Sequence, residues 1–207
     1  AASSQIPVVY LNLVGGQDEL IFDGGSMITD SHGKIVTQTT RFYEETCLVD
    51  IDTPSIPTTD FATQLSHDWC VELSEATDRT NKYKHSLTTP LSPEAELYTA
   101  LVVATRDYVQ KSGFTDICLG LSGGVDSALV ATIATDALGA DHVHPVLMPS
   151  RYSSDHSLND AQDLLERQGI VAQTVPIEET HQSFHNLLSP SLGDEFPGFT
   201  DENLQAR

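Results

Sequence analysis

The sequence predicts an α/β protein with a doubly wound parallel sheet, preceded by a segment rich in β-strands. From residue 93 onward, short apolar runs alternate with amphipathic stretches that end in glycine, as helices commonly do. Before residue 52, shorter apolar runs are separated by turns rich in glycine and aspartate, which is typical of β-structure. A β-α-β-α-β order implies right-handed crossovers and therefore parallel strands.

The β-rich segment contains one hairpin signature and one long apolar run. Residues 30–33, Asp-Ser-His-Gly, separate two strand-like runs and predict the hairpin. Residues 6–14 are almost continuously apolar, so we expect a strand buried on both faces. Between residues 52 and 91 the pattern dissolves into Thr, Pro, Ser and charged residues, which indicates a connecting region. The strands expected here are 6–14, 20–22, 27–29, 34–38 and 47–51.

Helices and strands alternate in the remainder of the chain. Ser92 and Pro93 are suited to the N-cap and first turn of a helix, which Gly113 ends. Ligands of parallel α/β sheets bind at the carboxyl ends of the strands. The elements expected after this helix are strands at 116–121, 143–148 and 171–177 and helices at 126–138, 154–168 and 178–188.

Composition restricts the class of partner. Thirty acidic residues against ten basic ones give a net charge of −20, which argues against binding to nucleic acid or to an anionic membrane. No apolar run approaches the ~20 residues that span a bilayer. Three cysteines, Cys47, Cys70 and Cys118, form no CxxC pair, and an odd number fits a reducing compartment, so we expect a cytoplasmic protein.

Two other groupings favour ordinary packing over chemistry. His67 and Cys70 have the spacing of half a metal site, but no second half is identifiable. His142 and His144 are two residues apart on a predicted strand, so they share a face, and we expect them to be partnered surface histidines.

The most specific motif is Leu-Gly-Leu-Ser-Gly-Gly-Val-Asp-Ser at residues 119–127. It joins a predicted strand to a predicted helix, whose unpaired N–H groups and dipole attract phosphate. Glycines let the backbone approach the phosphate oxygens closely. No Gly-Lys-Ser or Gly-Lys-Thr closes the loop, so it is not of the Walker type. The residues expected to form this phosphate site are Gly120, Leu121, Ser122, Gly123, Gly124, Val125, Asp126 and Ser127.

The side chains of this loop suggest separate roles. The hydroxyls of Ser122 and Ser127 can donate to phosphate oxygens. The Asp126 carboxylate approaches a phosphate usefully only through a cation, so we assign it to Mg²⁺. A tight strand–helix turn with an aspartate at the helix start is the alternative reading.

The turn after the next predicted strand is expected to complete the site by binding a flat base. Met148 can lie against the face of the base. Arg151, Ser153 and Ser154 come within reach of charged parts of a substrate, while Ser153 or Ser154 can equally serve as a helix cap.

The loop resembles the pyrophosphate loop of the ATP-pyrophosphatase superfamily, the adenine nucleotide α-hydrolase-like proteins. Together with residues 146–154, 174–178 and 202–207, it makes residues 93–207 similar to glutamine-dependent NAD synthetases. Residues 10–26 resemble the late part of the nitrilase-like glutaminase domain, an α-β-β-α fold, that precedes the synthetase in that family. The resemblance implies a glutaminase part at 1–55, a connector at 56–92 and a synthetase part at 93–207.

This resemblance implies a reaction in two halves. ATP and Mg²⁺ adenylate the nicotinate carboxylate of deamido-NAD, and ammonia then displaces AMP to give NAD. A Cys-Glu-Lys set releases the ammonia from glutamine. Asn203 falls at the family position that contacts deamido-NAD, although an exposed asparagine at a helix start is an equal alternative.

In the family, the glutaminase Cys, Glu and Lys would precede Ala1, so no catalytic residue is assigned and none of the three cysteines inherits that role. A second acidic metal ligand would follow Arg207. We therefore expect an internal fragment, inactive alone, of a homo-oligomeric parent that acts on small molecules. Another amidating ATP pyrophosphatase and a non-catalytic nucleotide-binding module remain the alternatives.

Overall fold

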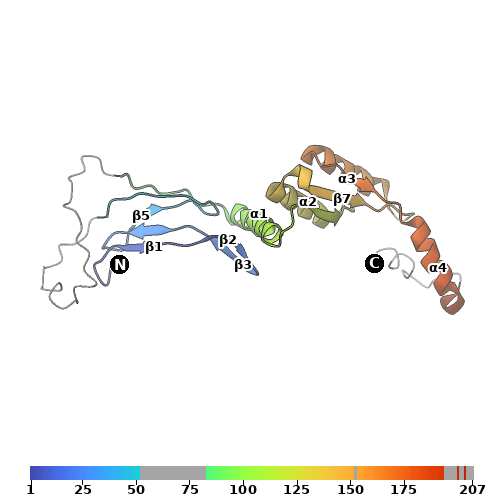
Figure 1. Cartoon of the computed structure of the whole chain (residues 1–207), viewed down its shortest axis with the longest axis horizontal. Coiled ribbons are helices and arrows are strands. Elements are labelled where there is room, and N and C mark those ends of the chain that lie inside the picture. Colours follow the sequence, from blue (N-terminus) through green and yellow to red (C-terminus); the bar gives the residue numbers. More distant parts are fainter. Residues whose placement is uncertain (52–82, 152, 194–199, 201–202, 204–207) are drawn as a thin grey trace. The chain divides into compact units, whose positions relative to one another are not determined.

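The computed structural model describes residues 1–51, 83–151, 153–193, 200 and 203, and it separates into two compact units. The first unit comprises Ala1–Gly15 and Phe22–Ser92, and the second comprises Gly16–Ile21 and Pro93–Arg207. Figure 1 shows the chain coloured along its sequence. None of the helices among these described residues has the length and hydropathy needed to cross a membrane.

The β-rich segment forms two small sheets. An antiparallel sheet has the order β1-β4-β5, with β1 at Val8–Tyr10, β4 at Met27–Thr29 and β5 at Ile35–Gln38. Strands β2 (Val14–Gln17) and β3 (Leu20–Asp23) pair with each other (Figure 1).

The predicted hairpin between β4 and β5 is confirmed. One oxygen of the Asp30 carboxylate accepts hydrogen bonds from the backbone N–H groups of His32 and Lys34, each at 2.9 Å. Gly33 has a φ of 87°, a conformation that favours glycine. These bonds lie within five consecutive residues, 30–34, so the turn could be predicted from the local sequence alone.

Two predictions in this segment are wrong. Residues 6–14 do not form one buried strand: Val8–Tyr10 form β1, in which all three residues are exposed, and Val14 begins the separate strand β2. β1 is an edge strand that pairs with β4 alone, and its residues remain 43–58% exposed. Residues 47–51 form no strand either, and Asp50 instead accepts a hydrogen bond from the Tyr83 N–H at 2.7 Å.

The connecting region is described only from residue 83 onward, so His67 and Cys70 lie outside the described residues. Its described end runs beside β5, where the Gln38 N–H donates to the Ser86 carbonyl at 2.9 Å. The Thr37 hydroxyl, almost fully buried, lies 2.9 Å from Nδ1 of His85. These bonds fasten residues 83–92 to the first unit.

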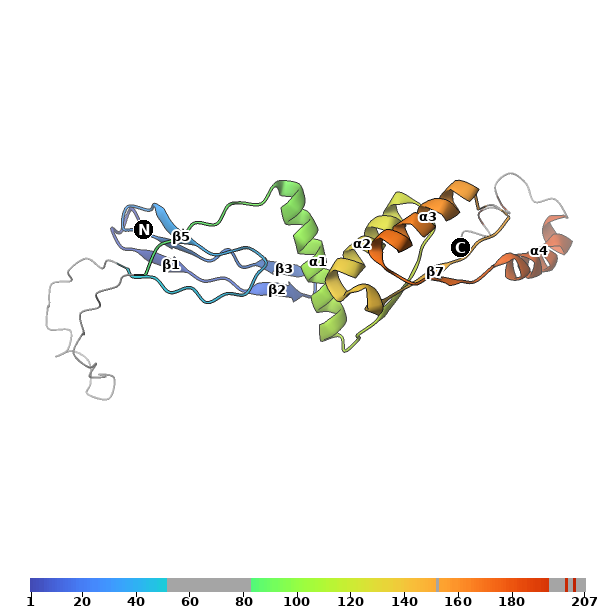
Figure 2. The ribbon, with the colours of Figure 1, turned by 90° about the horizontal axis from the view of Figure 1, so that it is seen from above.

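The second unit is an α/β fold with the predicted parallel sheet (Figure 2). The strand order is β6-β7-β8, and the register places Ile117 opposite Val143 and Gly120 opposite Val146. The strands are β6 (Ile117–Gly120), β7 (Val143–Leu147) and β8 (Gln173–Thr174). The helices are α1 (Pro93–Lys111), α2 (Val125–Leu138), α3 (Asp155–Gln168) and α4 (Glu178–Leu192), with a 3₁₀ turn, η3 (Ala140–His142), before β7.

The last strand and the last helix differ in length from their predictions. β8 has two residues instead of seven, and Val171 before it is 85% exposed. The Val175 N–H still donates to the Leu147 carbonyl at 2.8 Å, but Pro176 has no N–H with which to continue the pairing. α4 continues past the predicted residue 188 to Leu192 and includes Pro190.

The core of the second unit lies between the sheet and helices α2 and α3. Much of it is built from alanine, which brings helices close to a sheet because the side chain is short. The loop that joins β6 to α2 therefore begins on a well-packed base. The buried core residues are Leu121, Ala131, Ala134, Val143, Ala161, Leu165 and Ile170.

Candidate functional site

The loop at residues 120–127 lies at the carboxyl edge of the parallel sheet. The Leu121 N–H donates to the carbonyl of Val146 at 3.0 Å, so the loop leaves the sheet beside the end of β7. Leu121 is buried, whereas Ser122, Gly124, Val125 and Asp126 are exposed. The loop is thus anchored at its start and open to a ligand afterwards, as the motif predicted.

Two serine hydroxyls fold this loop on itself. The hydroxyl oxygens of Ser122 and Ser127 are 3.0 Å apart. Ser127 Oγ also accepts from the Ser122 N–H at 3.2 Å and donates to the Gly124 carbonyl at 3.0 Å. Since Ser127 uses its proton on Gly124, the proton between the two hydroxyls comes from Ser122. A phosphate oxygen bound by Ser122 would replace Ser127 Oγ as the acceptor of this hydrogen bond.

The helix after the loop starts without a side-chain cap. Gly124 is the N-cap of α2, and no side chain accepts from the first turn. Uncapped N–H groups carry the positive end of the helix dipole, which favours an anion. Asp126 is the acidic residue of that turn, and it is exposed.

Asp126 is suited to bind Mg²⁺ together with substrate phosphates, and not as part of a preformed cluster of protein ligands. Among the residues that the structure describes, no group of three or more His, Cys, Asp or Glu side chains could hold a metal ion. Mg²⁺ is commonly bound by one or two carboxylates together with substrate phosphates. Asp126, next to the uncapped helix start, suits that mode of binding.

Packing against another helix requires the glycine at position 123, and packing against Met148 constrains position 120 less strictly. Gly123 has a φ of 80°, and a Cβ placed on it would lie 2.0 Å from the carbonyl oxygen of Ser157 in α3. A Cβ on Gly120 would lie 3.2 Å from Cε of Met148. The close contact with α3 is a feature that the sequence did not reveal.

The turn after β7 lies at the same edge. Met148 is about half exposed beside Gly120, and its contact with a base stays a prediction. Ser154 is the N-cap of α3 and accepts from the Ser157 N–H at 3.2 Å. The capping alternative is therefore confirmed for Ser154, while a ligand role stays a prediction.

Arg151 faces α4 in this structure. Its Nε donates to Oε1 of Glu178 at 2.8 Å, its backbone N–H donates to Oε2 of the same carboxylate at 3.3 Å, and Nη2 reaches Gln182 at 3.2 Å. The hydrogen bond from Arg151 holds the pKa of Glu178 below its usual value. The predicted contact of Arg151 with a substrate would have to compete with this ion pair.

Asn203 is helical and exposed, as expected of a residue near a helix start. Residues 201–202 and 204–207 around it lie outside the described part. Its contact with a second substrate stays a prediction.

His142, the last residue of η3, and His144 in β7 lie at the other end of the sheet. Nε2 of His144 is 2.9 Å and Nδ1 of His142 is 3.4 Å from Oδ1 of Asp116, which precedes β6. The Thr115 hydroxyl donates to the other oxygen of that carboxylate at 2.5 Å. Hydrogen bonds from Thr115 and the histidines lower the pKa of Asp116 to about 2. The partnered state predicted for these histidines is confirmed, whereas the prediction that both lie on one strand is wrong, because His142 ends the 3₁₀ turn before β7.

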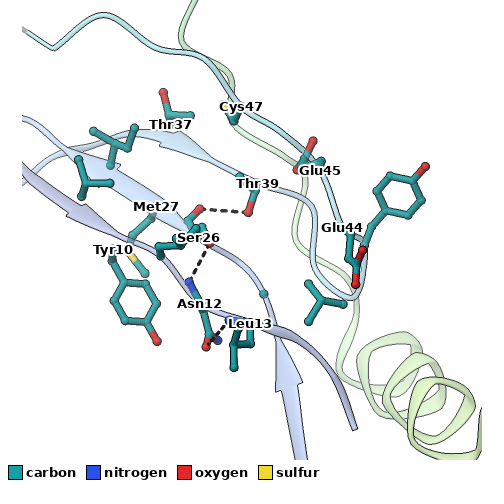
Figure 3. A pocket seen from close by; sticks show the side chains of 16 residues that line it. Tyr10, Asn12, Leu13, Ser26, Met27, Thr37, Thr39, Glu44, Glu45 and Cys47 are labelled. Atoms are coloured by element: carbon teal, nitrogen blue, oxygen red, sulfur yellow. Dashed lines mark hydrogen bonds between the residues drawn. The ribbon is translucent and has the colours of Figure 1, made fainter. Parts of the chain in front are cut away.

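The first unit contains a pocket of about 350 Å³ between its strands and the segment around Cys47 (Figure 3). Asn12 lines the pocket, and its backbone N–H donates to Ser26 Oγ at 3.0 Å. Glu44 and Glu45 line the pocket with Cys47, but none of the described lining residues is a lysine. A Cys-Glu-Lys set is therefore not assembled among these residues.

Comparison with known proteins identifies both parts of the chain. Residues 97–207 match the family model for NAD synthase, and residues 1–60 match the model for carbon-nitrogen hydrolase. The chain belongs to the NAD synthase family. The family assignment drawn from the loop, the turn after β7 and the β2–β3 region is thereby confirmed.

Curated members of the family are similar over nearly the whole chain. The glutamine-dependent NAD(+) synthetase of Thermotoga maritima is 40% identical over 98% of this chain and 36% of its own length. The enzyme of that name from Synechocystis sp. is 40% identical over 98% of this chain and 32% of its own length. The chain thus spans about a third of the length of these NAD synthase relatives.

Solved structures agree on the fold. A glutamine-dependent NAD+ synthetase from Acinetobacter baumannii, in complex with adenosine diphosphate, is 38% identical with a TM-score of 0.78 over 99% of this chain and 34% of that one. A second, from Cytophaga hutchinsonii, is 19% identical with a TM-score of 0.67 over 96% of this chain and 35% of that one, and supports the fold alone. The predicted fold class, a parallel α/β sheet after a nitrilase-like β-rich segment, is confirmed for this NAD synthase family member.

Proposed function

We propose that this chain is part of a glutamine-hydrolysing NAD synthetase and supplies its ATP loop. The observation that carries the proposal is the joining, in one chain, of a carbon-nitrogen hydrolase match with a lysine-free phosphate loop at a parallel sheet edge. A hydrolase part that releases ammonia complements a ligase part that consumes it. The names of the relatives, and the nucleotide bound to the Acinetobacter baumannii enzyme, support the same function.

In the proposed reaction a carboxylate is activated before it is amidated. A carboxylate oxygen of the nicotinate group of deamido-NAD attacks the α-phosphorus of ATP, and the bond to pyrophosphate breaks. The nitrogen of ammonia then attacks the carboxyl carbon, and AMP leaves with the electrons of its bond to that carbon. NAD is the amide product. AMP is needed as the leaving group because a carboxylate by itself is a poor acyl donor.

The described residues divide this work among them. The N–H groups at the start of α2, together with Ser122 and Ser127, hold the phosphates, and the stabilisation of charge on departing pyrophosphate is their main contribution. Asp126 would hold Mg²⁺, which supplies further positive charge beside the phosphates. Met148 covers the base, and Asn203 offers a donor and an acceptor to deamido-NAD.

The remaining properties belong to the same proposal. We assign residues 1–55 to the glutaminase domain, 56–92 to the connector and 93–207 to the synthetase domain, limits that the two family matches support. Free thiols at Cys47 and Cys118 support a reducing, cytoplasmic location. The net charge of −20 supports small-molecule substrates in place of nucleic acid or membrane partners. A homo-oligomeric parent, and a lack of activity in the isolated chain, complete the proposal.

The proposal is tested by identifying the nucleotide that ATP is converted to. The full-length protein that carries this chain, given deamido-NAD, ATP, Mg²⁺ and either glutamine or ammonium, should form one AMP and one pyrophosphate for each NAD. Formation of ADP would overturn the proposal, as would ATP binding without any NAD formation. The isolated chain, assayed in parallel, should form no NAD.

A further inference from the structure

The turn between β2 and β3 belongs to the second unit, although it lies within the stretch that matches the carbon-nitrogen hydrolase model. Residues Gly16–Ile21 group with the synthetase-like residues from Pro93 onward, whereas the residues on both sides of the turn group with the first unit. The chain therefore passes twice from one unit to the other within a few residues, and something must hold this turn on the second unit.

Two side chains of α1 bind both polar backbone groups of Gly16. Asp107 Oδ2 accepts from the Gly16 N–H at 2.8 Å. Lys111 Nζ donates to the Gly16 carbonyl at 2.5 Å. Asp107 and Lys111 are one helical turn apart, and Nζ lies 3.4 Å from Oδ2, so the two side chains also support each other. We call this pair the α1 clamp.

The clamp is a close-fitting and partly buried contact. Gly16 is buried, and a Cβ added to it would meet the Cα of Ala104 at 3.2 Å. The Asp107 side chain is only 13% exposed. Burial acts to raise the pKa of Asp107, but the Gly16 N–H and the cations of Arg106 and Lys111 outweigh it and hold that pKa below its usual value. The carboxylate is thus kept charged for this contact.

A continuous set of contacts joins the clamp to the ATP loop. α1 carries the clamp and packs on α2, and the Tyr98 hydroxyl of α1 donates to Oδ2 of Asp136 in α2 at 2.5 Å. α2 begins directly after the loop, at Val125. A change at the loop can therefore reach Gly16 through two packed helices, and from Gly16 the covalent chain leads into the hydrolase-like segment.

We propose that the α1 clamp couples glutamine hydrolysis to amidation by holding the Gly16–Ile21 turn, with Asp107 and Lys111 as positioning residues. The coupling rests on the proposed function, because it requires both activities in one protein. Without the clamp, each part keeps its own chemistry, but ammonia release no longer keeps pace with its use.

The experiment compares Asp107→Ala with wild type in the full-length protein. The glutamate released per NAD formed should rise by about 2- to 30-fold, the range spanned by known coupling effects. NAD formation from ammonium should stay within about twofold, because the hydrogen bonds and ion pairs of Asp107 join it to Gly16, Arg106 and Lys111 and not to the loop. Backbone hydrogen exchange at Gly16 should become faster. Asp107→Asn, which keeps an acceptor for the Gly16 N–H, should restore part of the wild-type ratio.

Asp163→Ala is the matched control, since it removes an (i, i+4) carboxylate–cation pair with Arg167 from α3. It should leave the glutamate-to-NAD ratio unchanged. An equal loss of ammonium-supported and glutamine-supported synthesis in Asp107→Ala would overturn the clamp, because it would reveal a purely structural role. An unchanged glutamate-to-NAD ratio in Asp107→Ala would also overturn the clamp, provided that the wild-type protein makes NAD from ammonium. A wild type that makes no NAD from ammonium would overturn the proposed function instead.

Discussion

Substitution of Gly123 by alanine tests the geometry of the phosphate loop most directly. This glycine has a φ of 80°, and an added Cβ would lie 2.0 Å from the carbonyl oxygen of Ser157. The oxygen belongs to the backbone of α3, so it has no side-chain rotamer with which to move away. Either the loop or the first turn of α3 must shift.

The loss of folding free energy in Gly123→Ala has two parts. An alanine held at positive φ costs about 1–2 kcal/mol. The clash falls short of an ordinary contact by about 1.4 Å, and forcing extra volume into a packed site costs about 1–3 kcal/mol. The free energy of unfolding should therefore fall by about 2–5 kcal/mol, which lowers the melting temperature by on the order of 10 °C.

Gly113→Ala is the matched control for this prediction. Gly113 has a φ of 82°, but an added Cβ there meets nothing within 4 Å. Thermal and urea unfolding of both variants separate the backbone cost, which they share, from the clash, which only Gly123→Ala has. Equal destabilisation of the two variants would refute the close contact between the loop and α3. ATP binding, followed by titration calorimetry, should weaken only in Gly123→Ala.

Other perturbations address the loop and the opposite edge of the sheet. Asp126→Ala should lower NAD formation by the full-length protein by on the order of 10²-fold, about 3 kcal/mol, while glutamine hydrolysis persists. A wild-type rate of NAD formation by this variant at saturating Mg²⁺ would show that Asp126 does not hold the metal and only occupies the start of the helix. Ser127→Ala removes the acceptor of the Ser122 N–H and the donor to Gly124, so unfolding should require about 1 kcal/mol less. An unchanged urea midpoint would contradict that network. Asp116 has a folded-state pKa lowered from 3.8 to about 2, so its stabilising effect is complete above pH 4 and is lost as the pH falls through about 2. Asp116→Asn should flatten the melting-temperature profile in that window, and a profile identical to that of wild type would show that the carboxylate gains nothing from its partners.

Local patterns were sufficient for most of the second unit. Pro93 begins α1, and glycines follow its end and the ends of α2 and α3, as the sequence predicted. Helix limits are predictable because caps and breakers act within one turn of the chain. The phosphate loop was equally readable, since its glycines, serines and aspartate stand next to the strand and helix that position them.

Burial in the first unit and the exact partners of polar side chains were decided by tertiary structure. The apolar run at 6–14 resembles a central strand, yet whether a strand is central depends on neighbours that its own residues do not encode. The same applies to the pairing of Arg151 with Glu178, which are 27 positions apart.

Sequence by itself determined the order of the elements, the phosphate loop and the family of this chain, because each is written in residues close together. Only the tertiary structure revealed that Gly123 lies against Ser157 and that Gly16 is held by Asp107, 91 residues away. A glycine signals that a side chain is not tolerated, but the atoms that exclude it come from another part of the chain. Those distant contacts, and not the motif alone, set the shape of the loop and the place of the turn.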